Sequence, residues 1–210
     1  MLKRITGELK SHAPFTSLGA ATGIIFIIVI AVGNFLPKIS PISQDIFYVL
    51  HPTHVFLSAL TTTSIYMKFE GHRLWKAVVV GITGSLGIAT LSDCIIPYIG
   101  ETLLGFDKGI HIGFIEKPLL TNPAAFLGIA IGYWKQITKF PHFGHVLIST
   151  WASLFHVIMA LSVGAMINWF QIIAVFVFLF LAVWVPCCTS DIVYPLIFTR
   201  NRNEAHFHPH

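Results

Sequence analysis

Two histidine pairs recur along the chain in matching sequence contexts. His51 and His54 begin the segment HPTHVFLS, and His142 and His145 begin the segment HFGHVLIS ninety-one residues later. Histidines three positions apart project from the same side of a helix, so each pair can bind one ion. The recurrence of the pair with matching Val and Ser positions predicts a duplicated unit.

An aspartate follows each histidine pair in a second repeated motif. Asp93 lies in LSDCIIP and Asp191 in TSDIVYP, and these motifs are offset by ninety-eight residues. Imidazole with carboxylate suits a divalent transition metal such as Zn²⁺, Fe²⁺ or Mn²⁺, and zinc or iron is favoured. We expect Ser92 and Ser190, which precede the aspartates, to donate hydrogen bonds rather than to act as nucleophiles.

Further histidines lie where they could complete these sites. His111 follows the first motif set in a glycine-rich segment, and His156 continues the polar face of the second pair. The tail AHFHPH adds three histidines that could collect metal at the surface. The predicted ligands are His51, His54, Asp93, His111, His142, His145, His156 and Asp191. Two histidines and one carboxylate leave coordination positions open, so an ion could leave or a substrate could bind. No catalytic residue is predicted.

The composition predicts that these polar groups lie inside a membrane protein. Of the 210 residues, 55% are hydrophobic and 10% are charged, against about 25% charged in soluble domains. Apolar runs long enough to span a bilayer are found at 15–36, 44–67, 76–97, 120–137, 142–166 and 169–197. We therefore predict an all-α integral membrane protein with six transmembrane helices. The three cysteines, all within predicted spans, are expected to pack as small apolar groups.

The charges predict the orientation. With the N-terminus inside, ten lysines and arginines lie on the inner side and three on the outer side, which is the bias of a cytoplasmic face. The predicted location is the inner (plasma) membrane, with several passes and both termini cytoplasmic. The net charge of +4 follows from this topology and from anionic lipids. The expected partners are therefore membrane lipids and a metal ion, and not nucleic acid.

The duplication predicts two inverted three-helix repeats, because three spans per repeat make the halves point in opposite directions. The predicted parts are the first repeat at 1–97, an outer connecting loop at 98–119, the second repeat at 120–199 and a cytoplasmic His-rich tail at 200–210. In this topology His51, His54 and Asp93 lie near the outer face, and their counterparts in the second repeat lie near the inner face. The connecting loop could fold back over the outer site.

The favoured function is a small divalent transition-metal transporter with His/Asp sites in each repeat. One alternative is a metal-dependent intramembrane enzyme, a hydrolase or an iron oxidase, since open coordination positions permit metal-activated water. Another is a haem-binding electron-transfer protein, although histidine pairs at opposite depths disfavour a shared haem. The sequence contains no HExxH, GxSxG or phosphate-binding loop, so these enzyme signatures give no support.

Overall fold

The computed structural model describes residues 2–70, 73–106, 109–136, 141–161, 168–189 and 193–198, and all regular structure in these residues is helical. The expected all-α class is confirmed. The helices are α1 Leu2–Val32, α2 Leu36–Glu70, α3 Leu74–Ile82, α4 Ile88–Thr90, α5 Ile96–Leu103, α6 Gly113–Glu116, α7 Pro118–Lys135, α8 Pro141–Ala160, α9 Trp169–Cys188 and α10 Tyr194–Ile197, with π-helical segments η1 Thr83–Gly87 and η2 Leu91–Ile95.

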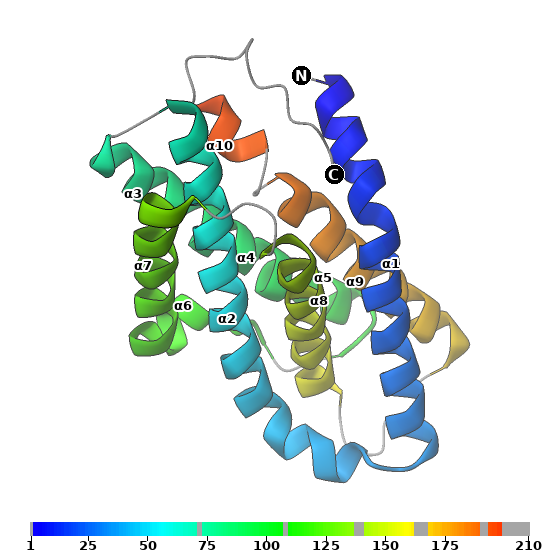
Figure 1. Ribbon diagram of the computed structural model, residues 1–210. Coiled ribbons are helices and arrows are strands. Elements are labelled where there is room, and N and C mark those ends of the chain that lie inside the picture. Colours follow the sequence, from blue (N-terminus) through cyan, green and yellow to red (C-terminus); the bar gives the residue numbers. More distant parts are fainter. Residues whose placement is uncertain are drawn as a thin grey trace.

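The long helices form an elongated bundle in which the chain runs back and forth (Figure 1). α1 packs against α8 and α9, whereas α7 packs against α2 and α3, and α2 also crosses α8. Gly132 permits close approach of α7 to α2, because a Cβ there would lie 2.7 Å from the Leu60 carbonyl oxygen. The start of α1 and the short helix α10 lie at the same end of the bundle (Figure 1).

The segment from α3 to α5 is one long helix with two wider turns. The predicted span 76–97 ends at Pro97, but the helix continues through Pro97 to Leu103. A proline in an α-helix clashes with the carbonyl four residues earlier, here that of Asp93. The π-helical turn η2, Leu91–Ile95, lies at this point, and the wider turn relieves the clash. Such turns occur often at functional sites.

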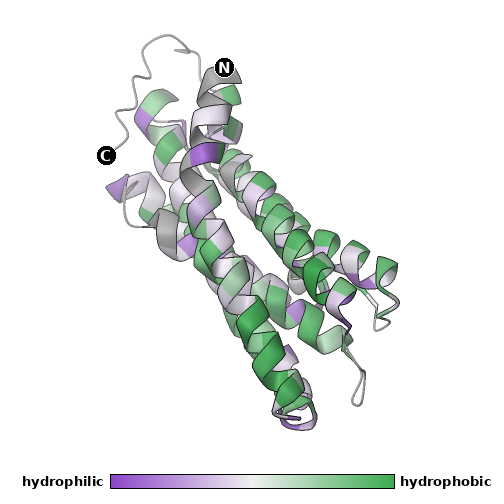
Figure 2. Ribbon diagram, turned by 90° about the vertical axis from the view of Figure 1, so that its right-hand side faces the viewer, coloured by the Kyte–Doolittle hydropathy of each residue, from purple (hydrophilic) through white to green (hydrophobic). Residues whose placement is uncertain are grey.

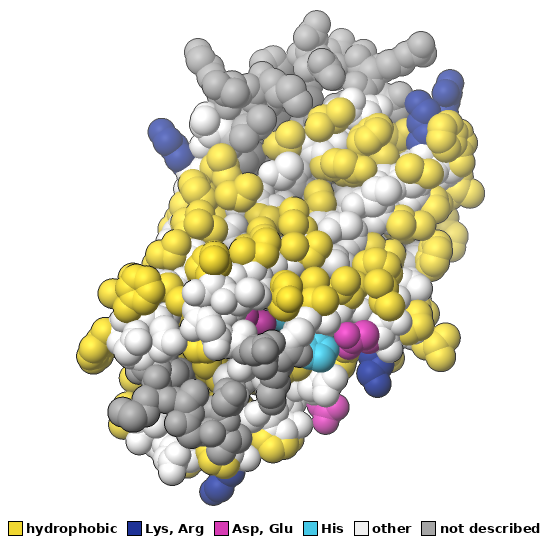
Figure 3. Space-filling model, turned by 180° about the vertical axis from the view of Figure 1, so that it is seen from behind, with side chains coloured by type: hydrophobic (Ala, Val, Ile, Leu, Met, Phe, Trp, Pro, Cys, Tyr) yellow, Lys and Arg dark blue, Asp and Glu magenta, His cyan; other side chains and the backbone are white. Residues whose placement is uncertain are grey.

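The outer surface of the bundle is apolar. Val32, Leu119 and Trp169 are more than three-quarters exposed, and Figure 2 shows hydrophobic residues along most of the helical length. Figure 3 shows apolar side chains covering the middle of one face, with lysine or arginine toward the ends. Charges at the ends of an apolar surface are typical of a protein surrounded by lipid.

Three helical stretches of the described chain are long and apolar enough to cross a membrane: Ala13–Val32, Leu74–Leu103 and Trp169–Cys187. They correspond to the first, third and sixth of the expected spans. An apolar helix at Gly144–Ala160 is shorter. α2 is not among these stretches, and its middle carries buried polar side chains such as His54, Thr61 and Thr63. The apolar helices indicate a membrane-embedded protein, while the six-span arrangement goes beyond this finding.

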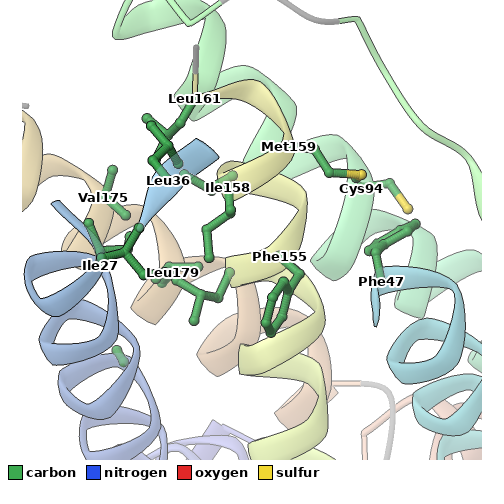
Figure 4. Packing of buried hydrophobic residues seen from close by; sticks show 14 of the residues in the cluster. Ile27, Leu36, Phe47, Cys94, Phe155, Ile158, Met159, Leu161, Val175 and Leu179 are labelled. Atoms are coloured by element: carbon green, nitrogen blue, oxygen red, sulfur yellow. The ribbon is translucent and has the colours of Figure 1, made fainter. Parts of the chain in front are cut away.

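The largest apolar cluster packs α8 against α1 and α9. Leu179 of α9 lies between Ile27 of α1 and Ile158 of α8 (Figure 4), and all three side chains are buried. The cluster extends to Phe47 of α2 and to Cys94. This packing fixes the positions of the helices that carry the polar groups of the interior.

Candidate metal centre

Three potential metal ligands from distant parts of the chain converge inside the bundle. His54 lies on α2, His145 on α8 and Cys187 on α9, and all three side chains are buried. The Nε2 atoms of the two histidines are 3.1 Å apart. The Cys187 Sγ lies 3.8 Å from the His54 Nε2. These three residues, called here the central site, form the group of ligand atoms within 4.8 Å of one another in the described residues.

The spacing of the central site fits tetrahedral metal coordination. With zinc–nitrogen bonds of about 2.05 Å and zinc–sulfur bonds of about 2.3 Å, tetrahedral angles place two nitrogens about 3.3 Å apart and nitrogen and sulfur about 3.6 Å apart. The observed separations are 3.1 Å and 3.8 Å. Three ligands leave a fourth position for water or another donor. Two imidazoles and a thiol suit Zn²⁺ or a copper ion better than harder ions such as Mn²⁺.

Asp93 orients the His54 ring. Its Oδ2 lies 2.6 Å from the His54 Nδ1, so the ring donates from Nδ1 and presents the Nε2 lone pair to the central site. A carboxylate in this position holds a ligating imidazole in its tautomer and orientation. Asp93 was predicted as a ligand, but it lies behind the ligand and not within the converging group. Because the buried Asp93 carboxylate accepts a hydrogen bond from Nδ1, the proton of the His54 ring stays on Nδ1.

The remaining acceptor positions of Asp93 are also filled. Oδ2 is 3.0 Å from the His51 Nδ1, and Oδ1 accepts hydrogen bonds from the hydroxyls of Ser92 at 2.8 Å and Ser149 at 2.9 Å. The role expected for Ser92 is thus confirmed, while Ser190 lies outside the described residues. A buried carboxylate needs such partners, because its desolvation is otherwise costly. The donors come from α2, η2 and α8, so the network ties the two halves of the chain together.

The sequence predicted that the two histidine pairs lie near opposite faces of the membrane. In the structure, His54 of the first pair and His145 of the second instead lie together. His54 and His145 are equivalent positions of the two motifs, and their Nε2 atoms are in contact. The expectation placed His54 in the first turns of its helix, but α2 starts at Leu36, so His54 lies near its middle. His145 lies near the start of α8, which begins inside the bundle beside α2 (Figure 1). The His142 side chain and Asp191 lie outside the described parts of the chain.

His111 and His156 were expected to complete the outer and inner sets separately, but the structure places the two residues side by side. Their rings meet edge to face, with centroids 5.8 Å apart. The His111 Nδ1 is paired with Glu116 and the His156 Nδ1 with Glu101. They therefore form a cluster of their own, away from the central site. The histidines of the C-terminal tail lie outside the described residues.

The turn at Gly113, which lies in the predicted connecting segment 98–119, packs against His51 of the first histidine pair. A Cβ added at Gly113 would lie 2.7 Å from the His51 Nε2, so only glycine fits here. The Thr121 hydroxyl donates to the Gly113 carbonyl at 3.1 Å and holds this turn in place. Residues 98–119 are only partly loop, since they contain the last turns of α5 and all of α6.

Cys187 is the member of the central site that the sequence analysis missed, because buried thiols usually pack as small apolar groups. A signal was present in the spacing. Cys187 precedes Asp191 by four residues, and side chains four apart share one face of a helix. A helix that turns the aspartate toward the interior therefore also turns Cys187 toward it.

No protein-family model, curated protein or solved structure matches this chain. The function is therefore inferred from the chemistry of the residues themselves.

Proposed function

We propose that the protein is a small membrane transporter of a divalent transition-metal ion, and that the central site binds the transported ion. The observation that carries this proposal is the convergence of His54, His145 and Cys187 in a buried group with the spacing of metal ligands. The thiol favours Zn²⁺ among the divalent ions considered, because thiolate is a soft ligand.

The contribution of both halves to one site supports a transport role. His54 comes from the first predicted repeat, and His145 and Cys187 come from the second. The packing of α1 on α8 and α9 parallels the packing of α7 on α2 and α3, as expected if the halves are related by a two-fold axis in the membrane plane. Transporters built from inverted repeats bind substrate near the middle of the membrane, between the repeats.

The distribution of charge supports the proposed topology. Lys10 lies in the first part of α1, and Lys68 and Lys135 lie in the last turns of α2 and α7, which run toward the end of the bundle where α1 starts (Figure 1). Lys38 lies in the first turn of α2 and Lys117 directly precedes α7, so these two lie at the opposite ends of the same helices. We propose that the first end is cytoplasmic, in an inner (plasma) membrane protein with six spans and both termini inside.

Polar side chains on α2 offer an interior route past the central site. Ser58, Thr61, Thr62 and Ser64 are all buried, with exposures of at most 1%. They follow His54 on the helix toward the proposed cytoplasmic end. Lipid-facing positions would carry apolar residues, as α1 and α9 do, so buried hydroxyls mark the interior face. Such hydroxyls can replace part of the hydration shell of a passing ion.

An intramembrane enzyme is the second candidate, because three protein ligands with an open fourth position also describe catalytic zinc sites. A haem bridged by His54 and His145 fits the geometry poorly. Two axial nitrogens in line at about 2.0 Å from the iron would be about 4 Å apart, and the Nε2 atoms here are 3.1 Å apart.

Metal content and uptake would test the proposal together. Protein purified without added metal is expected to contain about one equivalent of transition metal, and the double variant H54A/H145A is expected to lose it. Proteoliposomes that contain the native chain should take up Zn²⁺, and proteoliposomes that contain the H54A/H145A variant should not. Unchanged metal content would refute the ligand assignment. Retained metal without uptake would refute transport in favour of a catalytic or structural site.

A further inference from the structure

A second group of metal-ligating side chains lies apart from the central site. The His156 Nδ1 is 2.7 Å from the Glu101 Oε1, and these side chains are 1% and 2% exposed. His156 lies on α8 and Glu101 on α5. A carboxylate is rarely placed so deep in a helical bundle without a functional role.

A partly exposed pair adjoins this buried pair. The His111 Nδ1 is 3.2 Å from the Glu116 Oε2, and the two side chains are 24% and 35% exposed. The Glu116 carboxylate also accepts a hydrogen bond from the Tyr48 hydroxyl. The ring of His111 meets the ring of His156 edge to face. Figure 3 shows histidine and acidic side chains together at the surface, next to the apolar area.

Both histidines of this cluster have the arrangement seen at His54. The Nδ1 of each ring is paired with a carboxylate, which leaves Nε2 as the atom available to an ion. The His156 Nε2 is buried and has no hydrogen-bond partner in the described structure. An unpaired buried acceptor costs free energy unless a ligand satisfies it.

We propose that Glu101, His111, Glu116 and His156, called here the surface cluster, form a second divalent-cation site that loads ions from solution. Imidazole and carboxylate without a thiol give it a harder ligand set than that of the central site. The ligand atoms of the surface cluster do not converge within 4.8 Å as those of the central site do. The side chains must therefore draw together around an ion, and this cost, with the partial exposure of His111 and Glu116, makes binding weaker and exchange faster. Binding at this cluster does not depend on the proposed transport, whereas its loading role does.

A chain of contacts links the surface cluster to the central site. The Phe47 ring meets His156 edge to face at 5.5 Å and stacks on His51 at 5.3 Å, between ring centroids. His51 shares the Asp93 carboxylate with His54. The cluster thus lies next to the hydrogen-bonded network that orients His54.

Cobalt titration of the full-length, detergent-solubilised protein would test this site. Co²⁺ bound at the central site gives a thiolate-to-cobalt charge-transfer band, and Co²⁺ at the surface cluster does not. After removal of metal, the native chain is expected to bind two equivalents, of which one develops the band. Binding of a single equivalent would overturn the proposal.

Variants separate the two sites. H111Q changes a partly exposed side chain, so the fold is retained, and it should weaken the equivalent without the band at least tenfold. The control D45N removes an exposed carboxylate of α2 one turn before Tyr48 and should leave both equivalents unchanged. C187S should abolish the band and keep the second equivalent. If H111Q binds two equivalents as tightly as D45N does, the surface cluster is not a cation site. An unchanged band in C187S would instead refute the central site alone.

Discussion

His54 and His111 are both held through Nδ1 by a carboxylate, but their surroundings differ. At the central site His54 is 1% exposed and adjoins a second histidine and a thiol. In the surface cluster His111 is 24% exposed and adjoins carboxylates and one buried histidine. Burial and a soft ligand favour tight, selective binding, whereas exposure and hard ligands favour rapid exchange. Two such sites suit a sequence in which the surface cluster captures an ion from solution and the central site then selects the transported metal.

The largest expected effect comes from the Cys187 thiol, which the central site has and the surface cluster lacks. We expect C187A to weaken metal binding at the central site about 100-fold. Structural zinc sites are worth about 10–16 kcal/mol over four ligands, or roughly 3 kcal/mol for each. Competition with a chelator of known affinity would measure the change. C94A is the matched control, because Cys94 is also buried but lies outside the converging group. Equal affinities of C187A and C94A would contradict the ligand set.

Asp93 should have the next largest effect. D93N keeps the side-chain volume but offers only one oxygen to four donors. The histidine tautomer is then no longer fixed, so we expect metal affinity to fall by about 10–100-fold. The control T90A removes a buried hydroxyl of the same long helix that has no hydrogen-bond partner among the described residues. A D93N protein that binds Co²⁺ as tightly as T90A would show that Asp93 does not orient the site.

The serines of α8 provide a finer test. Ser149 donates to the Asp93 carboxylate, whereas Ser153 donates only to the Ser92 and Ser149 carbonyls. A hydrogen bond to a charged group is worth about 1.5–3 kcal/mol and a neutral one about 1 kcal/mol. We expect S149A to lower the unfolding temperature in detergent more than S153A and to weaken metal binding several-fold. The reverse order would mean that Asp93 does not depend on this donor.

The smallest expected effect is the response of the surface cluster to acid. Burial opposes ionisation of Glu116, but hydrogen bonds from Tyr48 and His111 outweigh it and hold the pKa of this carboxyl below its usual value. The ionised carboxylate therefore stabilises the segment above its usual pKa, and this stabilisation is lost as the pH falls through the lowered value. Hydrogen exchange of residues 109–117, with chelator present, should accelerate only once the pH falls below the usual pKa of a glutamate side chain. E116Q should remove this pH dependence, and an unchanged profile in E116Q would assign it to another group.

The sequence predicted the helical class and the polar groups that matter most. His54, His145 and Asp93 were identified because their motifs recur, and recurrence distinguishes a functional residue from an isolated polar one. The position of each residue along the length of the bundle was not predictable in the same way. This position depends on where a helix begins relative to its neighbours, and α2 begins before the apolar run that was taken as its span.

Of the surface cluster, the sequence predicted the two histidines as ligands but not their carboxylate partners, for a related reason. Glu101 and His156 are 55 residues apart and carry no shared motif. Their contact depends on the continuation of α5 through Pro97, which the wider turn η2 permits. A proline read from sequence alone indicates a helix end. Only the packing of α5 against α8 brings the glutamate to the histidine.

X-ray absorption at the zinc edge tests the central claim most directly. Zinc-loaded native protein, with excess metal removed, is expected to show one sulfur neighbour at about 2.3 Å and two imidazole nitrogens at about 2.0–2.1 Å. The sulfur contribution should vanish in C187A and persist in C94A. A metal surrounded only by nitrogen and oxygen in the native protein would contradict the assignment of His54, His145 and Cys187 as its ligands.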